Sequence, residues 1–148
     1  RFGESHRSRV GTEPNHFVLP LEEVWIDLMK VELKKSFRFE AAHNLPFAPE
    51  GHRCRNLHGH GYVVDVVVEG EIDPKHKWFV EYGEILNACQ PVKQMLDHKR
   101  INDIPGLEAG TAEMLSVFIW NHLQGLVPGL KAIVVHETST SSCTYRGE

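Results

Sequence analysis

The most constraining feature of this chain is a strict two-residue alternation over residues 31–43. Phe37, Phe39, Ala41 and His43 fall on one side of this segment. Successive side chains of a β-strand point to opposite faces, so the alternation predicts a strand that ends at a histidine. The segment therefore predicts a sheet with one face covered by other elements.

Four further segments are predicted to be extended. A β-branched and aromatic run over residues 61–69 and an apolar run over 78–82 are separated by a turn that contains Asp73-Pro74, so they predict a hairpin. Residues 131–138 form another apolar strand, and residues 144–146 add a last extended stretch. The strand order is not deducible from this pattern.

Two segments switch to helical spacing. Residues 82–96 carry apolar side chains at helical intervals, and Pro91 inside them predicts a kink or a break. Residues 111–124 predict a second helix, capped by Thr111 or Gly110. Its expected buried stripe consists of Met114, Leu115, Phe118, Ile119 and Leu123. Hairpin strands with paired helices between them predict an α+β fold, an antiparallel sheet with helices on one face.

Composition narrows the class of protein. The 148 residues fit one domain. The net charge of −4, with histidine neutral, argues against nucleic-acid binding through bulk positive charge. No apolar run approaches the roughly 18 residues that span a bilayer, so we expect no membrane association. The three cysteines are an odd number, which favours a reducing compartment, the cytoplasm, with at least one free thiol.

The first residues differ from the rest of the chain. The opening ten are polar and lack clear periodicity, whereas the pattern sharpens from Val31 onward. We therefore expect one domain over residues 29–148, preceded by residues 1–28 as an N-terminal extension or a segment left by expression.

Three histidines form the first candidate site. His58 and His60 lie two residues apart, so on a strand both point to one face, and His43 ends the earlier strand. Three neutral imidazoles that converge match catalytic zinc, which keeps one coordination position open. The alternative is that these are ordinary polar positions on a half-exposed strand.

Cys54 lies in a polar loop four residues before His58. It could be a fourth zinc ligand, which would close the site, or a nucleophile or base beside the metal. The flanking Arg53 and Arg55 favour a thiolate, because nearby cations lower the pKa of a thiol. A buried, inert cysteine is the remaining alternative.

Acidic residues at element ends are further candidates. Asp97 and His98 follow the first helix and could form an acid–base couple, although a histidine there also suits the helix dipole. Glu137 ends an apolar strand, where it is either solvated or aimed at the guanidine-like edge of a heterocycle. Glu113 lies in the first turn of the second helix, whose positive end it can neutralise.

Together these segments resemble one family. In chain order the motifs are Phe37-x-Phe39-x-Ala41-Ala42-His43, Cys54-x-x-Leu57-His58-Gly59-His60, Leu96-Asp97-His98, Thr111-x-Glu113 and Glu137-Thr138. Over residues 29–148 the chain is similar to the 6-pyruvoyl-tetrahydropterin synthase family. Its last residues, 143–148, and the segment 102–108 resemble the bacterial branch that makes 6-carboxy-tetrahydropterin. The chain departs from the family's pattern at Glu81-Tyr82, where Asp-Phe is usual, and at Gly110, where Pro is usual.

The resemblance implies a tunnelling fold, with a four-stranded antiparallel sheet and two helices on one face. Such subunits join edge to edge into a barrel, usually as a homohexamer, with active sites at subunit boundaries. The residues that the resemblance assigns are, for zinc, His43, His58 and His60; for proton transfer, Cys54, Asp97 and His98; and for the pterin, Glu137 with Glu113 or Thr111.

The implied substrate is 7,8-dihydroneopterin triphosphate. In the queuosine branch the implied products are 6-carboxy-tetrahydropterin, acetaldehyde and triphosphate, which makes the enzyme a lyase that needs no redox cofactor. The candidates for binding the triphosphate are Arg53, Arg55, Lys99 and Arg100. Two alternatives remain: a 6-pyruvoyl-tetrahydropterin synthase, which stops after triphosphate loss, and a non-catalytic, zinc-stabilised pterin-binding module.

Overall fold

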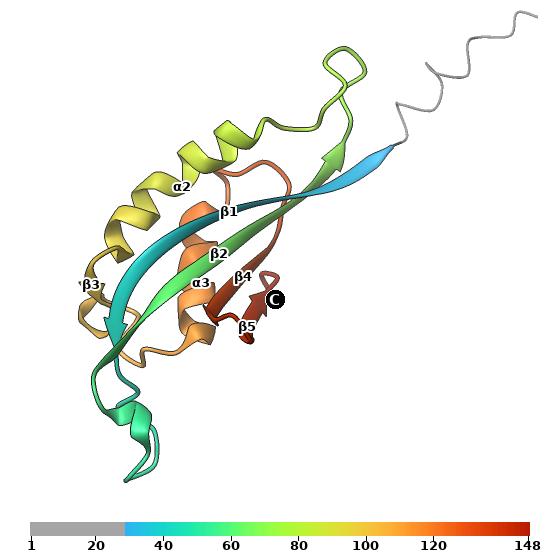
Figure 1. The fold of residues 1–148 in the computed structure, drawn as a ribbon. Coiled ribbons are helices and arrows are strands. Elements are labelled where there is room, and N and C mark those ends of the chain that lie inside the picture. The colour runs from blue at the N-terminus through green and yellow to red at the C-terminus, as the bar shows by residue number, and fades with distance from the viewer. Residues whose placement is uncertain (1–28) are drawn as a thin grey trace, which may run out of the picture.

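The computed structural model describes residues 29–148, and the extension expected at residues 1–28 lies outside the described residues. The strands are β1 (Lys30–His43), β2 (His58–Glu71), β3 (Lys99–Arg100), β4 (Leu130–Thr138) and β5 (Ser141–Tyr145). The helices are α2 (Tyr82–Leu96) and α3 (Ala112–Leu123), with short 3₁₀ helices η1 (Arg53–Arg55) and η2 (Ile101–Asp103). Both long helices lie against one face of the sheet (Figure 1). The predicted α+β fold is therefore confirmed.

The sheet has five strands in the order β3-β1-β2-β4-β5. All neighbouring pairs are antiparallel except β1 and β3, which pair in parallel over two residues. The expected four-stranded, purely antiparallel sheet is wrong in this detail. The short β3 is added because His98 donates its backbone N–H to the carbonyl oxygen of Glu40, which brings the chain alongside β1.

The strand predicted at residues 78–82 is not formed. The chain there bends, and Tyr82 already belongs to α2. Phe79 packs over Gly70, where any side chain would collide with its ring. The apolar residues of this segment thus cover the end of the sheet and do not extend it.

Helix α2 runs through Pro91 without the predicted break. A proline removes one hydrogen bond of the helix, but the helix buries its apolar side on the sheet, and tertiary packing supplies most of a helix's stability. The buried residues of this side are Ile85, Cys89, Val92 and Leu96, at the helical spacing predicted from the sequence.

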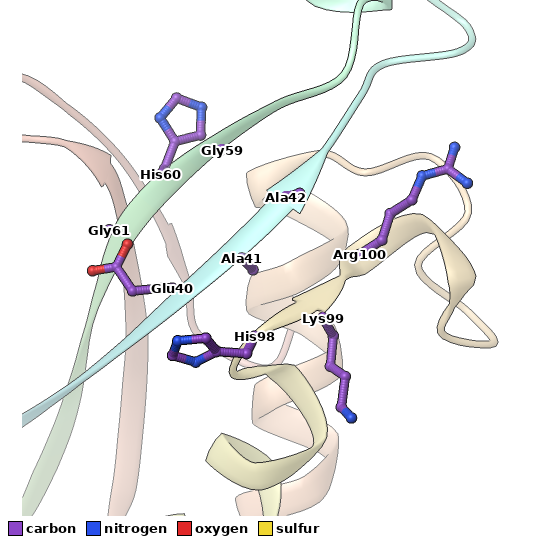
Figure 2. A pocket seen from close by; sticks show the side chains of 9 residues that line it. All are labelled: Glu40, Ala41, Ala42, Gly59, His60, Gly61, His98, Lys99 and Arg100. Carbon is purple, nitrogen blue, oxygen red and sulfur yellow. The ribbon is translucent and has the colours of Figure 1, made fainter.

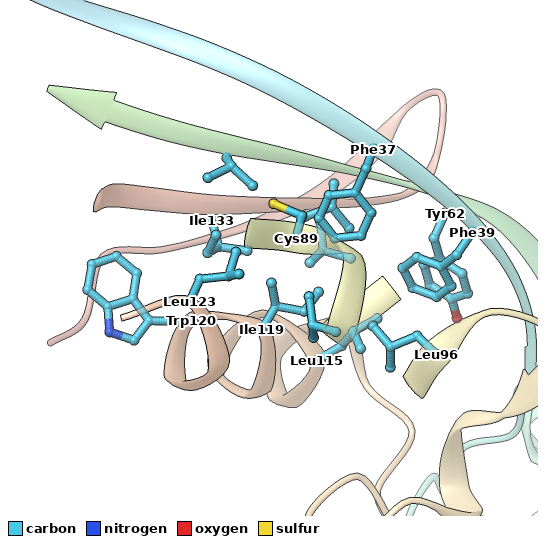
Figure 3. Packing of buried hydrophobic residues seen from close by; sticks show 14 of the residues in the cluster. Phe37, Phe39, Tyr62, Cys89, Leu96, Leu115, Ile119, Trp120, Leu123 and Ile133 are labelled. Atoms are coloured by element: carbon cyan, nitrogen blue, oxygen red, sulfur yellow. The ribbon is translucent and has the colours of Figure 1, made fainter. Parts of the chain in front are cut away.

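Helix α3 begins as predicted, since the Thr111 side chain accepts a hydrogen bond from the backbone N–H of Met114. Its stripe is only partly as predicted, because Met114 is exposed and Trp120 is buried in its place. Figure 3 shows Leu115, Ile119 and Leu123 packed with Phe37 and other sheet residues. This core includes the side chains on the helix-facing side of β1 and β2. The candidate histidines lie where β1 ends and β2 begins.

No helix among residues 29–148 is long and apolar enough to cross a membrane.

Candidate metal centre and the cavities beside it

Three imidazoles meet at the ends of β1 and β2. His43 is the last residue of β1 and pairs with His58, the first residue of β2, while His60 lies two residues further on the same face. One ring nitrogen from each lies within 4.8 Å of the other two. The structure thus brings together the three histidines that the sequence analysis proposed as a metal site.

Backbone carbonyls fix two of the rings. His43 Nδ1 lies 2.6 Å from the carbonyl oxygen of Gly110, and His58 Nδ1 lies 2.8 Å from that of Asn56. A carbonyl oxygen only accepts, so each Nδ1 carries the proton and each Nε2 keeps a free lone pair. Such outer contacts are typical of histidines that bind metal.

The surroundings of the buried Nε2 atom of His43 show whether the site fits a metal ion. This atom has no hydrogen-bond partner within residues 29–148. Glu137 Oε1 lies 3.2 Å away, near enough for an ion pair with a protonated ring, but the direction of approach does not make a hydrogen bond. Buried polar atoms are rarely left without a partner. An unpaired lone pair beside two further imidazoles therefore fits a metal ion.

The electrostatics of the site favour a neutral imidazole at His60. Burial lowers the pKa of His60, and the neighbouring His43 and His58 lower it further, against the opposing effect of Glu137. A neutral imidazole is the form that binds a metal. Tyr62, next along β2, is buried with its hydroxyl unpartnered, and burial raises its pKa, so the hydroxyl stays protonated.

A cavity of about 490 Å³ opens beside the histidines. Its walls come from the loop 44–57, the start of β2, the end of β4 and the first residue of β5. The residues that line it are Leu45, Arg53, Cys54, Asn56, His58, His60, Glu137, Thr138 and Ser141. Cys54 is half-buried here but is not part of the three-histidine cluster. Its thiol therefore shares the cavity with the histidines without being assembled with them as a fourth ligand.

Asp97 and His98 lie beside each other, but neither residue lines the Cys54 cavity. Asp97 accepts a hydrogen bond from the Glu40 backbone N–H at 2.9 Å, and its carboxylate lies 3.0 Å from His98 Nδ1. The hydrogen bond from Glu40 to Asp97, together with the bond from the His98 N–H to the Glu40 carbonyl, attaches the couple to the edge of β1. The hydrogen bond from the Glu40 backbone keeps the pKa of Asp97 below its ordinary value, with help from His98.

The ring of His98 lines a second hollow of about 540 Å³. Its lining also includes Glu40, Lys99 and His60, and Figure 2 shows the end of β1 lying between His98 and His60. Neither Cys54 nor Glu137 belongs to this hollow. Within one chain, the structure does not bring the Asp97–His98 couple to the cavity that holds Cys54.

The remaining predicted site residues differ in whether they line one of the two cavities. Glu137 lines the Cys54 cavity, with its carboxylate 3.4 Å from His60 Nε2. Thr111 and Glu113 line neither cavity; Thr111 caps α3, and Glu113 lies in its first turn. Sequence reasoning missed the role of the Gly110 carbonyl, for which the one signal was a glycine directly before a helix cap.

The departure at Gly110 has a structural reason. Its φ of +70° lies in the left-handed region, which proline cannot adopt. A side chain at this position would collide with the carbonyl oxygen of Asn44. Glycine therefore suits this backbone, from which the carbonyl oxygen reaches His43.

Comparison with solved structures identifies the class of fold. The structure of a Caenorhabditis elegans 6-pyruvoyl tetrahydropterin synthase matches with a TM-score of 0.74 and 23% identity, over 81% of this chain and 97% of that one. The chain is thus a tunnelling-fold protein that carries a three-histidine centre.

Sequence comparison identifies the family. The model of the family described as 6-pyruvoyl tetrahydropterin synthase matches residues 32–148. A 6-carboxy-5,6,7,8-tetrahydropterin synthase of Synechocystis is 38% identical over 117 residues, 75% of this chain and 89% of the relative. The human 6-pyruvoyl tetrahydrobiopterin synthase is 35% identical over 104 residues, 65% of this chain and 72% of the relative. The chain belongs to the 6-pyruvoyl tetrahydropterin synthase family.

Proposed function

We propose that this protein is a zinc-dependent 6-carboxy-5,6,7,8-tetrahydropterin synthase of queuosine biosynthesis. It would convert 7,8-dihydroneopterin triphosphate to 6-carboxy-tetrahydropterin, acetaldehyde and triphosphate. The observation that carries the proposal is the single cavity in which Cys54, two of the three clustered histidines and Glu137 meet. The Synechocystis relative supports the choice of this reaction.

The metal would be held by the free Nε2 atoms that the histidines present. His43 and His58 are oriented for this by the carbonyls of Gly110 and Asn56. When bound, zinc supplies Lewis-acid polarisation of oxygen atoms on the substrate's side chain.

The chain's own residues would bind the pterin and move protons. The Glu137 carboxylate would accept hydrogen bonds from the adjacent N–H groups of the pterin ring, at the end of the cavity formed by β4. The Cys54 thiolate would accept a proton from the substrate's side chain.

The position of Asp97 and His98 supports a site shared between copies of the chain. His98 lines the second hollow, with Asp97 beside it, and neither residue lines the Cys54 cavity of its own chain. We propose that it reaches the Cys54 cavity of a neighbouring copy and relays protons there. A closed oligomer, a hexamer in the cytoplasm, would provide this arrangement and would also pair the exposed edges of the sheet.

Product analysis tests the proposed reaction. Purified, zinc-loaded protein is incubated with 7,8-dihydroneopterin triphosphate, and the products are identified by mass spectrometry. We expect 6-carboxy-tetrahydropterin and acetaldehyde in equal amounts. A pyruvoyl side chain without acetaldehyde would instead support a 6-pyruvoyl-tetrahydropterin synthase, the activity named for the human relative.

Mixed oligomers test the shared site. Cys54→Ala and His98→Ala proteins are each expected to be nearly inactive, and a dissociated and reassembled mixture should regain activity because some sites receive both intact residues. Light scattering gives the mass of each assembly. A monomeric mass in dilute, zinc-replete buffer, or no recovery in verified mixed oligomers, would contradict the proposal.

A further inference from the structure

Four basic side chains lie near the two cavities; two of them donate hydrogen bonds within the chain, and a third lines only the second hollow. Arg55 donates a hydrogen bond to the carbonyl oxygen of Ala48 at 2.9 Å. The guanidinium of Arg100 donates to the side chains of Asp103 and Asn44, each at 3.0 Å. Lys99 lines the second hollow.

Arg53 differs from these three. It lies beside Cys54 in η1 and lines the Cys54 cavity, where it is the only lysine or arginine among the lining residues. Within residues 29–148 its guanidinium makes no hydrogen bond or ion pair with another side chain. The side chain is exposed, so a ligand in the cavity can reach it.

The cavity therefore has charges of opposite sign on different walls. The carboxylate of Glu137 comes from the end of β4, and the guanidinium of Arg53 comes from the loop before β2. A carboxylate attracts an N–H-rich ring and repels a polyanion. A guanidinium presents a planar fork of donors that matches phosphate oxygens.

We infer that Arg53 binds the triphosphate tail of the substrate and selects the phosphorylated pterin over its dephosphorylated form. This inference rests on the proposed function. Glu137 and Arg53 together would set the direction of the substrate across the histidine cluster, with the ring toward β4 and the tail toward η1. Arg53 would then be a specificity-determining residue.

Another role for Arg53 would be to act through its neighbour, by favouring the Cys54 thiolate. The two roles separate when Cys54 is absent. In a Cys54→Ala background, any effect of Arg53 on ligand affinity cannot arise from the thiol.

The test measures binding by calorimetry to zinc-loaded Cys54→Ala protein, with and without Arg53→Ala. The two ligands are 7,8-dihydroneopterin triphosphate and 7,8-dihydroneopterin. Loss of charge-assisted hydrogen bonds should weaken binding of the triphosphate about 10- to 100-fold. Binding of dihydroneopterin should change less than about twofold, since that ligand has no anionic tail. Arg53→Lys should retain part of the affinity for the triphosphate, because a point charge remains.

Lys75→Ala in the same background is the matched control, because it removes an exposed cation from the turn after β2, which lines neither cavity. Zinc content and circular dichroism verify that each variant is folded and loaded. Equal weakening of both ligands, or no weakening of either, by Arg53→Ala would overturn the inference while leaving the proposed function standing. If the Cys54→Ala parent binds neither ligand, both the proposed function and the inference fail.

Discussion

The Nδ1 atom of His43 lies 2.6 Å from the carbonyl oxygen of Gly110, although 67 residues separate them in the sequence. The contact joins the end of β1 to the residue just before the cap of α3. It fixes the protonated nitrogen of His43 and leaves Nε2 free toward His58 and His60.

Gly110→Ala should therefore weaken metal binding without touching a ligand. The new side chain would collide with the Asn44 carbonyl at a positive φ, so the backbone must shift and carry the carbonyl away from His43. Loss of such an outer contact typically costs about 10- to 100-fold in metal affinity. Competition with a fluorescent zinc chelator measures this loss.

Gly106→Ala is the matched control. Gly106 also has a positive φ, of +90°, but nothing lies within 4 Å of an added side chain. It therefore reports the cost of backbone strain alone. An equal loss of zinc affinity in both variants would contradict the role given to the Gly110 carbonyl.

His58→Ala should remove most of the bound metal. The variant leaves two imidazoles of three, too few for a stable zinc site in this cavity. Elemental analysis of the purified protein should give about one zinc per chain for the unchanged protein and little for the variant. His76→Ala, which alters a histidine of the exposed loop after β2, should retain zinc.

Metal removal also separates a catalytic centre from a structural one. A hydrophobic core of sheet and helix residues stabilises this fold without the metal. A chelator should therefore abolish activity and leave the circular dichroism nearly unchanged. Unfolding on chelation would instead support a zinc-stabilised structural module.

Cys54→Ala should lose activity and keep zinc. The cysteine lines the cavity but stands outside the histidine cluster. Removal of a proton-transfer group typically lowers the rate about 10²- to 10⁴-fold. Cys143→Ala, which removes a thiol 3.6 Å from Ser116 and outside the cavity, is the control. Loss of zinc together with activity in Cys54→Ala would make the cysteine a ligand.

Asp65 should make the stability of the fold depend on pH in the acid range. It is buried on the sheet face opposite the helices. Burial tends to raise the pKa of its carboxyl, but hydrogen bonds from Ser36 and His136 and the charge of Lys34 outweigh this and lower it. A lowered pKa in the folded state means that the stabilisation is complete above the unfolded pKa and is lost as the pH falls through the folded value.

Asp65→Asn should accordingly lower the free energy of unfolding at pH 7 by about 1–3 kcal/mol, since hydrogen bonds to a buried charge are lost. It should also flatten the decline in stability from about pH 5 toward pH 2. Urea unfolding at several pH values measures both effects. Glu50→Gln, in the exposed loop 44–57, serves as the reference; parallel pH profiles for Asp65→Asn and the unchanged protein would refute the prediction.

The sequence alone determined which residues share a face. Alternation along β1 placed His43 on the face of Phe39 and Ala41, because the direction of a side chain on a strand depends only on local period. The two-residue spacing placed His58 and His60 on one face of β2 for the same reason. The helical spacing of α2 and the cap of α3 at Thr111 were predictable for the same reason, since both depend on neighbours within a turn or two.

Only the tertiary structure decided which segments meet. The Gly110 carbonyl reached His43, the short β3 joined β1, and residues 78–82 covered the sheet without pairing to it. The Asp97–His98 couple was likewise placed at a different hollow from Cys54. These outcomes depend on hydrogen bonds and packing between residues far apart in the chain, and local periodicity carries no information about such partners.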